Sequence, residues 1–405
     1  MRSLGPRASF WTAAVVAGLA LWASAAPTVV YPLYAVQWNL TATVTTAIFA
    51  VYPLVLIPVL LVFGNVSDYI GRRAAILTGL AFLTAGAFAF ALAPDILWVF
   101  IGRGLMAFGV GLSLSPATAA MIEFGVPGQA HRASSTTTAA TATGLALATL
   151  VGGALVQYAP LPLHLSFWVV FAVILCTALV AWFLPRHTRD ESLGRWRPRA
   201  LHIPRDSRGP FVAGSLAIAA AYSVGAIFLA LGAQIARELV QSTNALVDGA
   251  VISVSAVVIG TVAILARSLP ARTAVTLGPI AAALGLAVLI ALGIAHSLPA
   301  FLVSSVLTGI GYSLMFSGGL GLLVKNAPVH QRAAVLSAAY VVAYALQAAT
   351  ALGLGAVATA SGLLFALVIG SPVIIVLGVA SLVVAHASRP ARGAGGYSPR
   401  ESAAS

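Results

Sequence analysis

The sequence predicts an all-α polytopic membrane protein, with twelve transmembrane helices in two pseudo-symmetric six-helix bundles. Three observations predict this fold: the composition, the regular succession of apolar runs and the distribution of Lys and Arg. Apolar residues make up 60% of the 405 residues and charged residues only 7%. A soluble domain carries about 25% charged residues. This chain therefore has too few charges to cover a surface that faces water, and we expect the lipid bilayer to be its solvent.

Apolar runs of membrane-spanning length follow one another along the whole chain. A bilayer core about 30 Å thick needs about 20 apolar residues in a helix. The twelve runs are 12–37, 41–63, 74–93, 96–122, 134–159, 165–184, 210–235, 244–266, 273–295, 299–324, 333–358 and 363–387. The first begins like a signal peptide, with Arg2 and Arg7 before Ala23-Ser24-Ala25. It continues to Val36, which is too long for a signal core, so we expect it to remain as the first span.

Basic residues lie almost entirely on one side of the predicted membrane. When the loops are assigned to alternate sides, 19 of the 21 Lys and Arg fall on the side that holds both termini. The opposite side has only Arg237, and Arg103 lies inside a span. Because positive residues stay in the cytoplasm, we expect a multi-pass protein of the cell (plasma) membrane with both termini cytoplasmic. The net charge of +12 then reflects topology, and it requires no nucleic-acid partner.

One long hydrophilic segment divides the twelve runs six and six. We expect an N-terminal bundle over 1–184, a cytoplasmic linker over 185–209, a C-terminal bundle over 210–387 and a disordered tail over 388–405. A shift of 200 residues places 108–133 over 308–333, with six identities: Gly109, Gly111, Ser113, Leu114, Arg132 and Ala133 meet the same residue types. This similarity indicates a duplication. Both halves start from the cytoplasm, so the repeat is parallel, and we expect a substrate path between the halves.

A short charged loop follows the second run, with the sequence Gly64-Asn65-Val66-Ser67-Asp68-Tyr69-Ile70-Gly71-Arg72-Arg73. Gly64 can end a helix in a left-handed conformation, and Asp68 can cap or face a helix N-terminus. Gly71 would allow close helix approach, and the two arginines would lie at the membrane surface. The loop resembles the cytoplasmic signature of the major facilitator superfamily, a family of twelve-helix secondary transporters. It departs from that signature at Tyr69, where a basic residue is usual.

The resemblance implies that this loop belongs to a conformational latch, which holds the two bundles together at one face and releases them when they rock. The latch residues are Gly64, Asp68, Gly71, Arg72, Arg73, Glu123 and Arg132. Glu123 is expected to pair with one of the three arginines, and a solvated helix end is the alternative. The corresponding loop of the second half, Arg267 to Arg272, keeps basic residues but lacks the acid.

The fourth and fifth runs carry two further resemblances to this family. Arg103 opens the stretch Arg103-Gly-Leu-Met-Ala-Phe-Gly109, and many members have such an Arg, linked to proton coupling. A buried Arg must face a cavity or find acceptors, although snorkelling to the outer surface is an alternative. In the fifth run, Gly144 and Gly152-Gly153 resemble an exporter signature, but Ala148-Thr149 stands where that signature has Gly-Pro. The direction of transport is therefore left open.

Asp248 lies one turn inside the eighth run and is the one carboxylate placed to carry a transported proton. The alternative is an outer helix cap near Asn244. Arg103 and Asp248 belong to opposite halves at comparable depth. We therefore hypothesise that they form an ion pair when the outer side is closed. No cofactor is expected, and a proton gradient is the driving force that this assignment suggests.

Aromatic and polar residues at mid-depth predict a cavity between the halves. They are Trp22, Tyr31, Tyr52, Tyr222, Tyr312, Tyr340, Tyr344 and Gln347. The last three are spaced i, i+4, i+7 and share one helical face. Rings with a few hydrogen-bonding groups suit a moderately apolar organic substrate, and the scarcity of charge disfavours phosphate esters. Helix–helix packing is the alternative explanation for part of this set.

Missing motifs argue against several other functions. The sequence has no phosphate-binding Gly-Lys-Ser/Thr loop and no metal or nucleophile motif. The lone Cys176 excludes an internal disulfide and a cysteine-based metal site. We therefore expect no enzyme but a monomeric secondary transporter, in the first place a proton-coupled exporter of small, largely apolar organic molecules. An importer or uniporter of a small metabolite is the alternative, and a non-transporting receptor on a transporter fold is the rival from another class.

Overall fold

The computed structural model describes residues 3–126, 130–185, 196, 208–327 and 331–387. These residues form helices and no strands, which confirms the all-α prediction. Most of the predicted linker 185–209 and the whole predicted tail 388–405 lie outside the described residues.

Helices occupy all twelve predicted runs. The first half contains α1 (Pro6–Ala25), η1 (Ala26–Val29), α2 (Tyr31–Gln37), α3 (Ala42–Phe63), α4 (Val66–Ile70), α5 (Arg72–Ala91), α6 (Ile96–Phe124), α7 (Ala130–Tyr158) and α8 (Leu165–Ala181). The second half contains α9 (Arg208–Ala226), η4 (Ile227–Leu231), α10 (Gly232–Glu238), α11 (Ala245–Leu265), η5 (Ala266–Ser268), α12 (Ala271–Ala295), α13 (Leu298–Asn326), α14 (Arg332–Ser361) and α15 (Leu363–Ala387).

Within the described chain, eleven helical segments are long and apolar enough to cross a bilayer. The twelfth, α8, has 17 residues, which is about 25 Å of helix. That length approaches the hydrocarbon thickness of about 30 Å. The structure is therefore consistent with twelve spans, of which α8 is the shortest.

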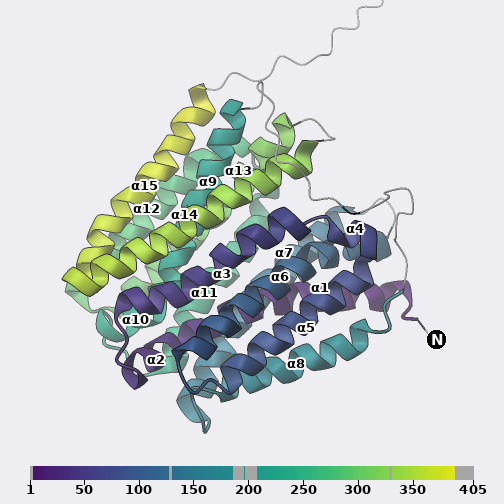
Figure 1. Cartoon of the computed structure of the whole chain (residues 1–405). Coiled ribbons are helices and arrows are strands. Elements are labelled where there is room, and N and C mark those ends of the chain that lie inside the picture. The colour runs from purple at the N-terminus through teal and green to yellow at the C-terminus, as the bar shows by residue number, and fades with distance from the viewer. Residues whose placement is uncertain (1–2, 127–129, 186–195, 197–207, 328–330, 388–405) are drawn as a thin grey trace, which may run out of the picture.

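The two halves repeat one packing scheme. In the first half α5 packs on α6 and α8, and in the second half α12 packs in the same way on α13 and α15. Likewise α1 packs on α6 and α7, as α9 packs on α13 and α14. Figure 1 shows the halves side by side, close together near α2 and α10 and diverging toward the end that carries α4. We refer to the end where α1 begins and α15 ends as the inner end, and to the opposite end as the outer end.

Glycine contacts fix the register of the repeat, which differs from the predicted one. In the first half Gly109 of α6 packs so closely on α5 that an added Cβ would lie 2.7 Å from the carbonyl oxygen of Gly79. In the second half Gly311, rather than Gly309, meets the equivalent helix α12. Helices α6 and α13 are both 29 residues long and begin 202 residues apart. The predicted shift of 200 is therefore wrong by two residues on this helix, because small residues are frequent enough to align in either register.

The first span of each half is interrupted at a corresponding place. Pro27 has no amide hydrogen and would clash with the carbonyl four residues earlier in a continuous helix. Accordingly α1 ends at Ala25, and the 3₁₀ turn η1 leads toward α2. In the second half the π-turn η4 joins α9 to α10, and η1 and η4 contact each other. Such irregular turns change the helical hydrogen-bond pattern, so side chains nearby must satisfy the carbonyl groups that are left free.

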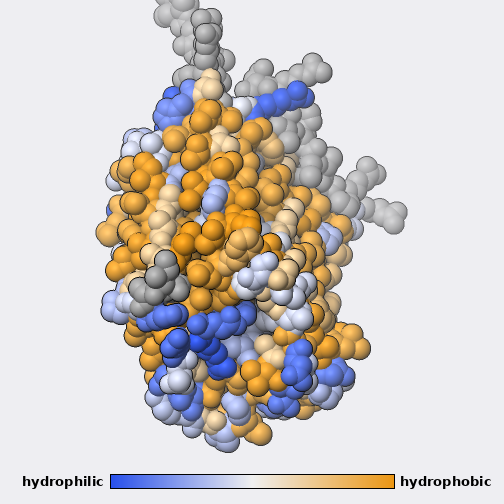
Figure 2. All heavy atoms as spheres, turned by 90° about the vertical axis from the view of Figure 1, so that its left-hand side faces the viewer, coloured by the Kyte–Doolittle hydropathy of each residue, from blue (hydrophilic) through white to orange (hydrophobic). Residues whose placement is uncertain are grey.

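Large apolar side chains cover the flanks of the molecule. Trp11, Leu97, Leu179 and Val376 are all more than half exposed, at 51%, 61%, 62% and 64%. Figure 2 shows hydrophobic residues over most of one face, with hydrophilic residues gathered toward its lower and upper parts. An apolar surface of this extent would associate in water, whereas helices satisfy their own backbone groups in lipid. The chain is therefore a multi-pass membrane protein.

Close packing at Gly109 predicts a position-specific loss of stability. Gly109→Ala should lower the unfolding temperature in detergent by several degrees, because overpacking costs about 1–3 kcal/mol. Gly104 is the matched control on the same helix, since the nearest atom to an added Cβ is 4.0 Å away. Gly104→Ala should leave the unfolding temperature unchanged or raise it slightly. Equal unfolding temperatures for the two variants would contradict the close contact between α5 and α6.

Candidate substrate pathway between the two halves

Helices α3 and α14 join the halves at the outer end through threonine side chains. The amide of Thr43 donates to Oγ1 of Thr359 at 2.9 Å, and the two hydroxyl oxygens are also 2.9 Å apart. Oγ1 of Thr43 further donates to the carbonyl of Gly355 at 3.2 Å. These bonds connect the start of α3 to the last turns of α14, and they hold this side of the outer end closed.

Helices α7 and α11 make the second junction at the outer end. Oε1 of Gln157 accepts from the amide of Ala245 at 2.8 Å, which satisfies a free donor at the start of α11. Gly153 packs against the backbone of Ala245, and Gly249 packs against the carbonyl of Thr149. The small residues of the incomplete exporter signature thus bring the two halves into contact, as small residues do in membrane helices generally. Together with α3 and α14, they close the outer end, while the halves diverge toward the inner end (Figure 1).

Arg103 lies at the break of the first span and is only 1% exposed. Its Nη1 donates to the carbonyl of Ser24 at 2.5 Å. In an unbroken helix that carbonyl would accept from the amide four residues later, but α1 ends one residue after Ser24. The guanidinium carbon also lies 5.0 Å from the ring centroid of Tyr52 and 5.7 Å from that of Phe49, within the range of cation–π attraction. Arg103 therefore points into the protein, and the snorkelling alternative is wrong.

The predicted aromatic residues of the second half form one cluster around Tyr222 of α9. Its ring centroid lies 4.9 Å from that of Tyr344, 6.2 Å from that of Tyr312 and 6.5 Å from that of Tyr340. Phe316, which the prediction did not include, stacks on Tyr222 at 5.9 Å. Apart from Tyr222, which is buried, these rings are partly exposed. They therefore leave aromatic surface that neighbouring side chains do not cover.

Tyr52 brings the first half to this cluster. It lies near Tyr312 and Tyr344 across the division between the halves, and it also contacts the Ser24 side chain. Gln347, on the same helix face as Tyr344, is 8% exposed, and its Oε1 has no hydrogen-bond partner among the described residues. Trp22 is partly exposed on α1. Tyr52 therefore links Arg103 to the aromatic cluster at mid-depth.

Tyr31 is placed differently from the rest of the predicted set. It follows the break in the first span, is 1% exposed and lines a pocket near the outer end. That pocket has a volume of about 240 Å³, and its opposite wall includes Gln234, Arg237 and Glu238 of α10. Tyr31 thus borders the pocket between α2 and α10, and its buried hydroxyl, which has no hydrogen-bond partner among the described residues, lies near Arg103.

The loop after α3 forms a compact charged structure at the inner end. Nη1 of Arg72 donates at 2.6 Å to Oδ1 of Asp68 and at 2.6 Å to Oγ of Ser67. Gly71 has φ = 87°, a left-handed conformation that favours glycine. Gly64 ends α3 with φ = −58°, so the predicted left-handed cap at Gly64 is wrong, and the reversal occurs at Gly71 instead.

The neighbours of this loop differ in part from the predicted latch. The guanidinium of Arg73 lies over the Trp182 ring at 5.3 Å. Glu123 is exposed, and among the described residues it forms no ion pair within 4.0 Å of Arg72, Arg73 or Arg132. The expected pairing of Glu123 is therefore absent from this closed-outside state, and the alternative of a solvated helix end describes it. Arg132 is also exposed.

Asp248 is buried in the first turn of α11, with 3% of its surface exposed. Asn244 caps this helix, since its Oδ1 accepts from the amides of Leu246 and Val247, so the cap role predicted as the alternative for Asp248 belongs to Asn244. The side chain of Ser242 hydrogen-bonds to Asp248, and Arg237 interacts with it electrostatically. Within the described part of the chain no ion pair joins Asp248 to Arg103. The hypothesised bridge is therefore wrong for this state, because Arg103 is committed to the Ser24 carbonyl.

The sequence analysis did not predict two contacts: that of Arg103 with the Ser24 carbonyl, and that of Thr43 with Thr359. The break at Pro27 was the available signal for a free carbonyl in this turn, because a proline ends the helix and the Ser24 carbonyl then loses its donor four residues later. The pairing of Thr43 with Thr359 carries no such signal. It depends on how two helices that are 316 positions apart in the chain approach each other.

Cross-linking tests the threonine junction at the outer end. A Thr43→Cys, Thr359→Cys double variant, made in a Cys176→Ser background, should form a disulfide on mild oxidation and lose transport. Transport should be lost because the disulfide holds the outer end closed. A reducing agent should break the disulfide and restore transport. Either single variant serves as the control and should be insensitive to oxidation. Full activity of the oxidised double variant would contradict a moving outer junction.

Substitution of Arg103 tests its role at the helix break. Arg103→Gln should lower the transport rate about ten-fold or more, because losing a charged partner leaves the Ser24 carbonyl buried and unsatisfied. Arg267→Gln, at an exposed Arg, is the matched control and should transport normally. Initial rates in vesicles with equal protein content provide the measurement. Normal rates for Arg103→Gln would show that the break holds without the guanidinium.

Comparison with known proteins gives one family and one fold. The family model described as the Major Facilitator Superfamily matches residues 10–351, and no curated relative matches the chain. A bacterial homologue of the human lysosomal transporter Spinster, in an inward-facing and unoccupied conformation, superposes with a TM-score of 0.74 at 14% identity. The alignment covers 95% of this chain and 97% of that one.

Two other solved transporters have the same fold. A peptide transporter, POT, in complex with sulfate has a TM-score of 0.76 at 17% identity, with 95% of each chain covered. A mutant of the nucleoside transporter NupG has a TM-score of 0.73 at 13% identity, with 93% of this chain and 99% of that chain covered. The family match extends from the first span to the eleventh and includes the loop at Gly64 and the buried Arg103. This chain belongs to the major facilitator superfamily, and it is a secondary transporter of that kind.

Proposed function

We propose that this transporter exports small, largely apolar organic molecules from the cytoplasm by alternating access, with protons moving inward as the driving ions. The inner end is the cytoplasmic end in this proposal, as the distribution of Lys and Arg suggests. The protein acts as a monomer in the plasma membrane, with one passage between its two halves.

The observation that carries the proposal is the aromatic cluster at mid-depth. Tyr222, Tyr312, Phe316, Tyr340 and Tyr344 form a continuous aromatic surface. Sites for organic ligands are mostly apolar and contain a few placed polar groups. Here Oε1 of Gln347 and Nε of Arg103 are buried without hydrogen-bond partners among the described residues. They offer one acceptor and one donor that could orient a substrate against the rings.

Burial of charge restricts the substrate class further. Among the described residues, the buried charged side chains are Arg103 and Asp248. Arg103 is held by Ser24, and Asp248 lies at the outer end of α11. A multiply charged substrate would need paired charges in the passage, since burying an unpaired charge is costly. Neutral or weakly charged organic molecules are therefore favoured.

Asp248 is the group that we assign to proton coupling. It is buried, one carboxylate oxygen has no partner among the described residues, and it lies in the helix that joins the halves at the outer end. Rocking of α11 against α7 would change its exposure, so its proton affinity would differ between the two states. A carboxylate that gains and loses a proton with that motion would couple inward proton movement to outward substrate movement.

Flux in proteoliposomes tests both parts of the proposal. A panel of fluorescent lipophilic dyes and neutral aromatic compounds should move against its gradient when a pH gradient is imposed, and should stop when a protonophore collapses that gradient. Asp248→Asn should abolish gradient-driven movement and retain downhill exchange. Glu238→Gln is the matched control, because Glu238 is an outer-end carboxylate that already accepts a hydrogen bond from Gln234. Unchanged gradient-driven transport in Asp248→Asn would refute the coupling assignment.

A uniporter or importer is the second candidate, and one observation favours it. The residues Ala148-Thr149 replace the Gly-Pro of the exporter signature, and Thr149 instead packs on Gly249. Flux that is independent of the pH gradient would support this candidate. No flux of any compound class would favour a receptor built on the transporter fold.

A further inference from the structure

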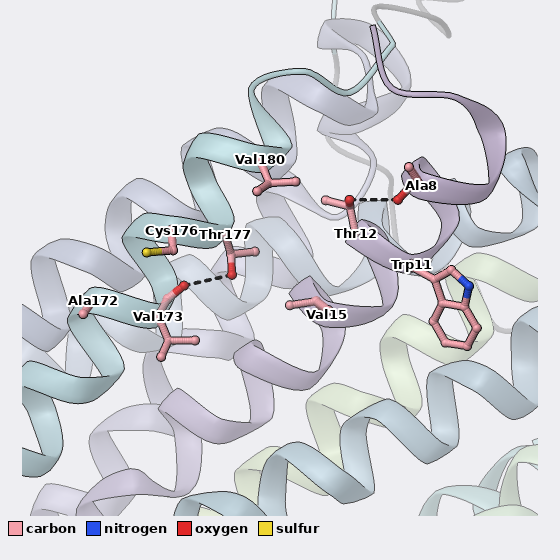
Figure 3. Close-up of a pocket in the computed structure, with 9 residues that line it drawn as sticks. All are labelled: Ala8, Trp11, Thr12, Val15, Ala172, Val173, Cys176, Thr177 and Val180. Atoms are coloured by element: carbon pink, nitrogen blue, oxygen red, sulfur yellow. Dashed lines mark hydrogen bonds between the residues drawn. The ribbon is translucent and has the colours of Figure 1, made fainter.

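A groove on the flank of the first half lies outside the substrate passage. It runs between α1 and α8, has a volume of about 470 Å³, and is lined by Ala8, Trp11, Thr12, Val15, Ala172, Val173, Cys176, Thr177 and Val180 (Figure 3). We propose that this groove binds an anionic phospholipid of the inner-end leaflet, with an acyl chain in the groove and the phosphate at Arg7.

The two hydroxyl groups in the walls of the groove are both hydrogen-bonded within their own helices. The hydroxyl of Thr12 donates to the carbonyl of Ala8 at 2.8 Å, and the hydroxyl of Thr177 donates to the carbonyl of Val173 at 2.8 Å. Figure 3 shows both bonds turned along their own helices. A polar ligand would therefore find no free hydroxyl there and only the indole N–H of Trp11 as a donor, whereas a hydrocarbon chain needs no hydrogen-bond partner.

The groove lies at the depth of lipid acyl chains near the inner end. α1 begins at Pro6 and α8 ends at Ala181, both at that end. From Ala8 to Val15 the groove follows about 10 Å of helix. This is roughly two thirds of the hydrocarbon thickness of one leaflet, counted from the headgroups. A bond from the amide of Leu4 to the carbonyl of Phe183, at 2.9 Å, ties the two helices together beyond the groove.

Arg7 supplies the charge that distinguishes an anionic lipid from a neutral one. Arg7, Trp11 and Val15 are exposed and spaced i, i+4, i+8, so they share one face of α1. Arg7 therefore lies one turn beyond Trp11 toward the inner end, where a headgroup would lie above its acyl chain. An arginine near the membrane surface attracts anionic lipids, and its guanidinium can bind two phosphate oxygens at once.

An extended hydrocarbon chain is thinner than a helix and fits an open apolar groove of about 470 Å³. A helix of a second copy laid over the same face is the competing occupant, and energy transfer between labelled copies distinguishes the two.

Cys176 gives a local reporter, because it lies in the groove wall, is exposed and is the only cysteine of the chain. The full chain, labelled there with a small fluorophore, is reconstituted into phosphatidylcholine vesicles. One set of vesicles contains brominated phosphatidylglycerol, and a second set contains brominated phosphatidylcholine at the same mole fraction. Quenching should reveal about a five-fold preference for phosphatidylglycerol, the scale expected for one arginine at the surface.

Two variants separate the charge from the groove. Arg7→Gln should equalise quenching by the two lipids, whereas Arg267→Gln, which removes an exposed inner-end Arg elsewhere, should keep the preference. Val15→Trp should fill the groove and reduce quenching by both lipids. Equal quenching by both lipids in the unmodified protein, or a preference that survives Arg7→Gln, would overturn the proposal. Energy transfer between labels on separate copies would overturn it as well, in favour of a dimer contact. Both readouts are independent of transport, so they hold whichever substrate the protein carries.

Discussion

A buried guanidinium at the break of the first span is the interaction on which the interior depends. Pro27 prevents a continuous helix, and the carbonyl of Ser24 loses its helical donor. Arg103 supplies a donor from α6, while Tyr52 and Phe49 cover the charge with their rings. A free carbonyl and an unpaired charge would each be costly in this apolar interior. Placed together, they stabilise a bent first span and keep one ionised group at the centre of the molecule.

The bend also decides where the two halves meet. Beyond it, α2 and the turn η1 approach α10 and η4 of the second half, and glycines and threonines complete the contact at α3–α14 and α7–α11. These contacts consist of close backbone approach and neutral hydrogen bonds, each worth only about 1 kcal/mol net. An outer end joined in this way is stable in one state but can separate when a substrate binds or a proton moves. The inner end is different, because the ion pair of Arg72 with Asp68 lies within one loop and joins no two halves.

Much of the fold could be predicted from the sequence because hydrocarbon imposes few solutions. The spans, the six-and-six division and the loop at Gly64 all follow from local patterns, such as run length, charge and glycine spacing. The clustering of Tyr222 with Tyr340 and Tyr344 was also partly visible, since two of these residues share a helix face.

What could not be predicted depends on helices that are distant in the chain. The side-chain partner of Arg103 was assigned to Asp248 because both lie at similar depth, but depth alone does not fix the direction in which a side chain points. Glu123 was assigned to the arginines by the same kind of argument, and it is exposed instead. The register of α6 against α13 failed because small residues carry little information in such a composition. In each case the outcome depended on rotations and offsets between helices, and only the packed structure determines these.

The most direct test of alternating access about this outer junction is a pair of distance measurements by electron spin resonance in nanodiscs. One spin-label pair would replace Thr41 and Ala360 at the outer end, and the other Ile70 and Lys325 at the inner end, each in a Cys176→Ser background. Two populations are predicted, in which the outer distance lengthens as the inner distance shortens when transported compounds or pH are varied. A single distance at each end under all conditions, or changes of the same sign at both ends, would contradict the account.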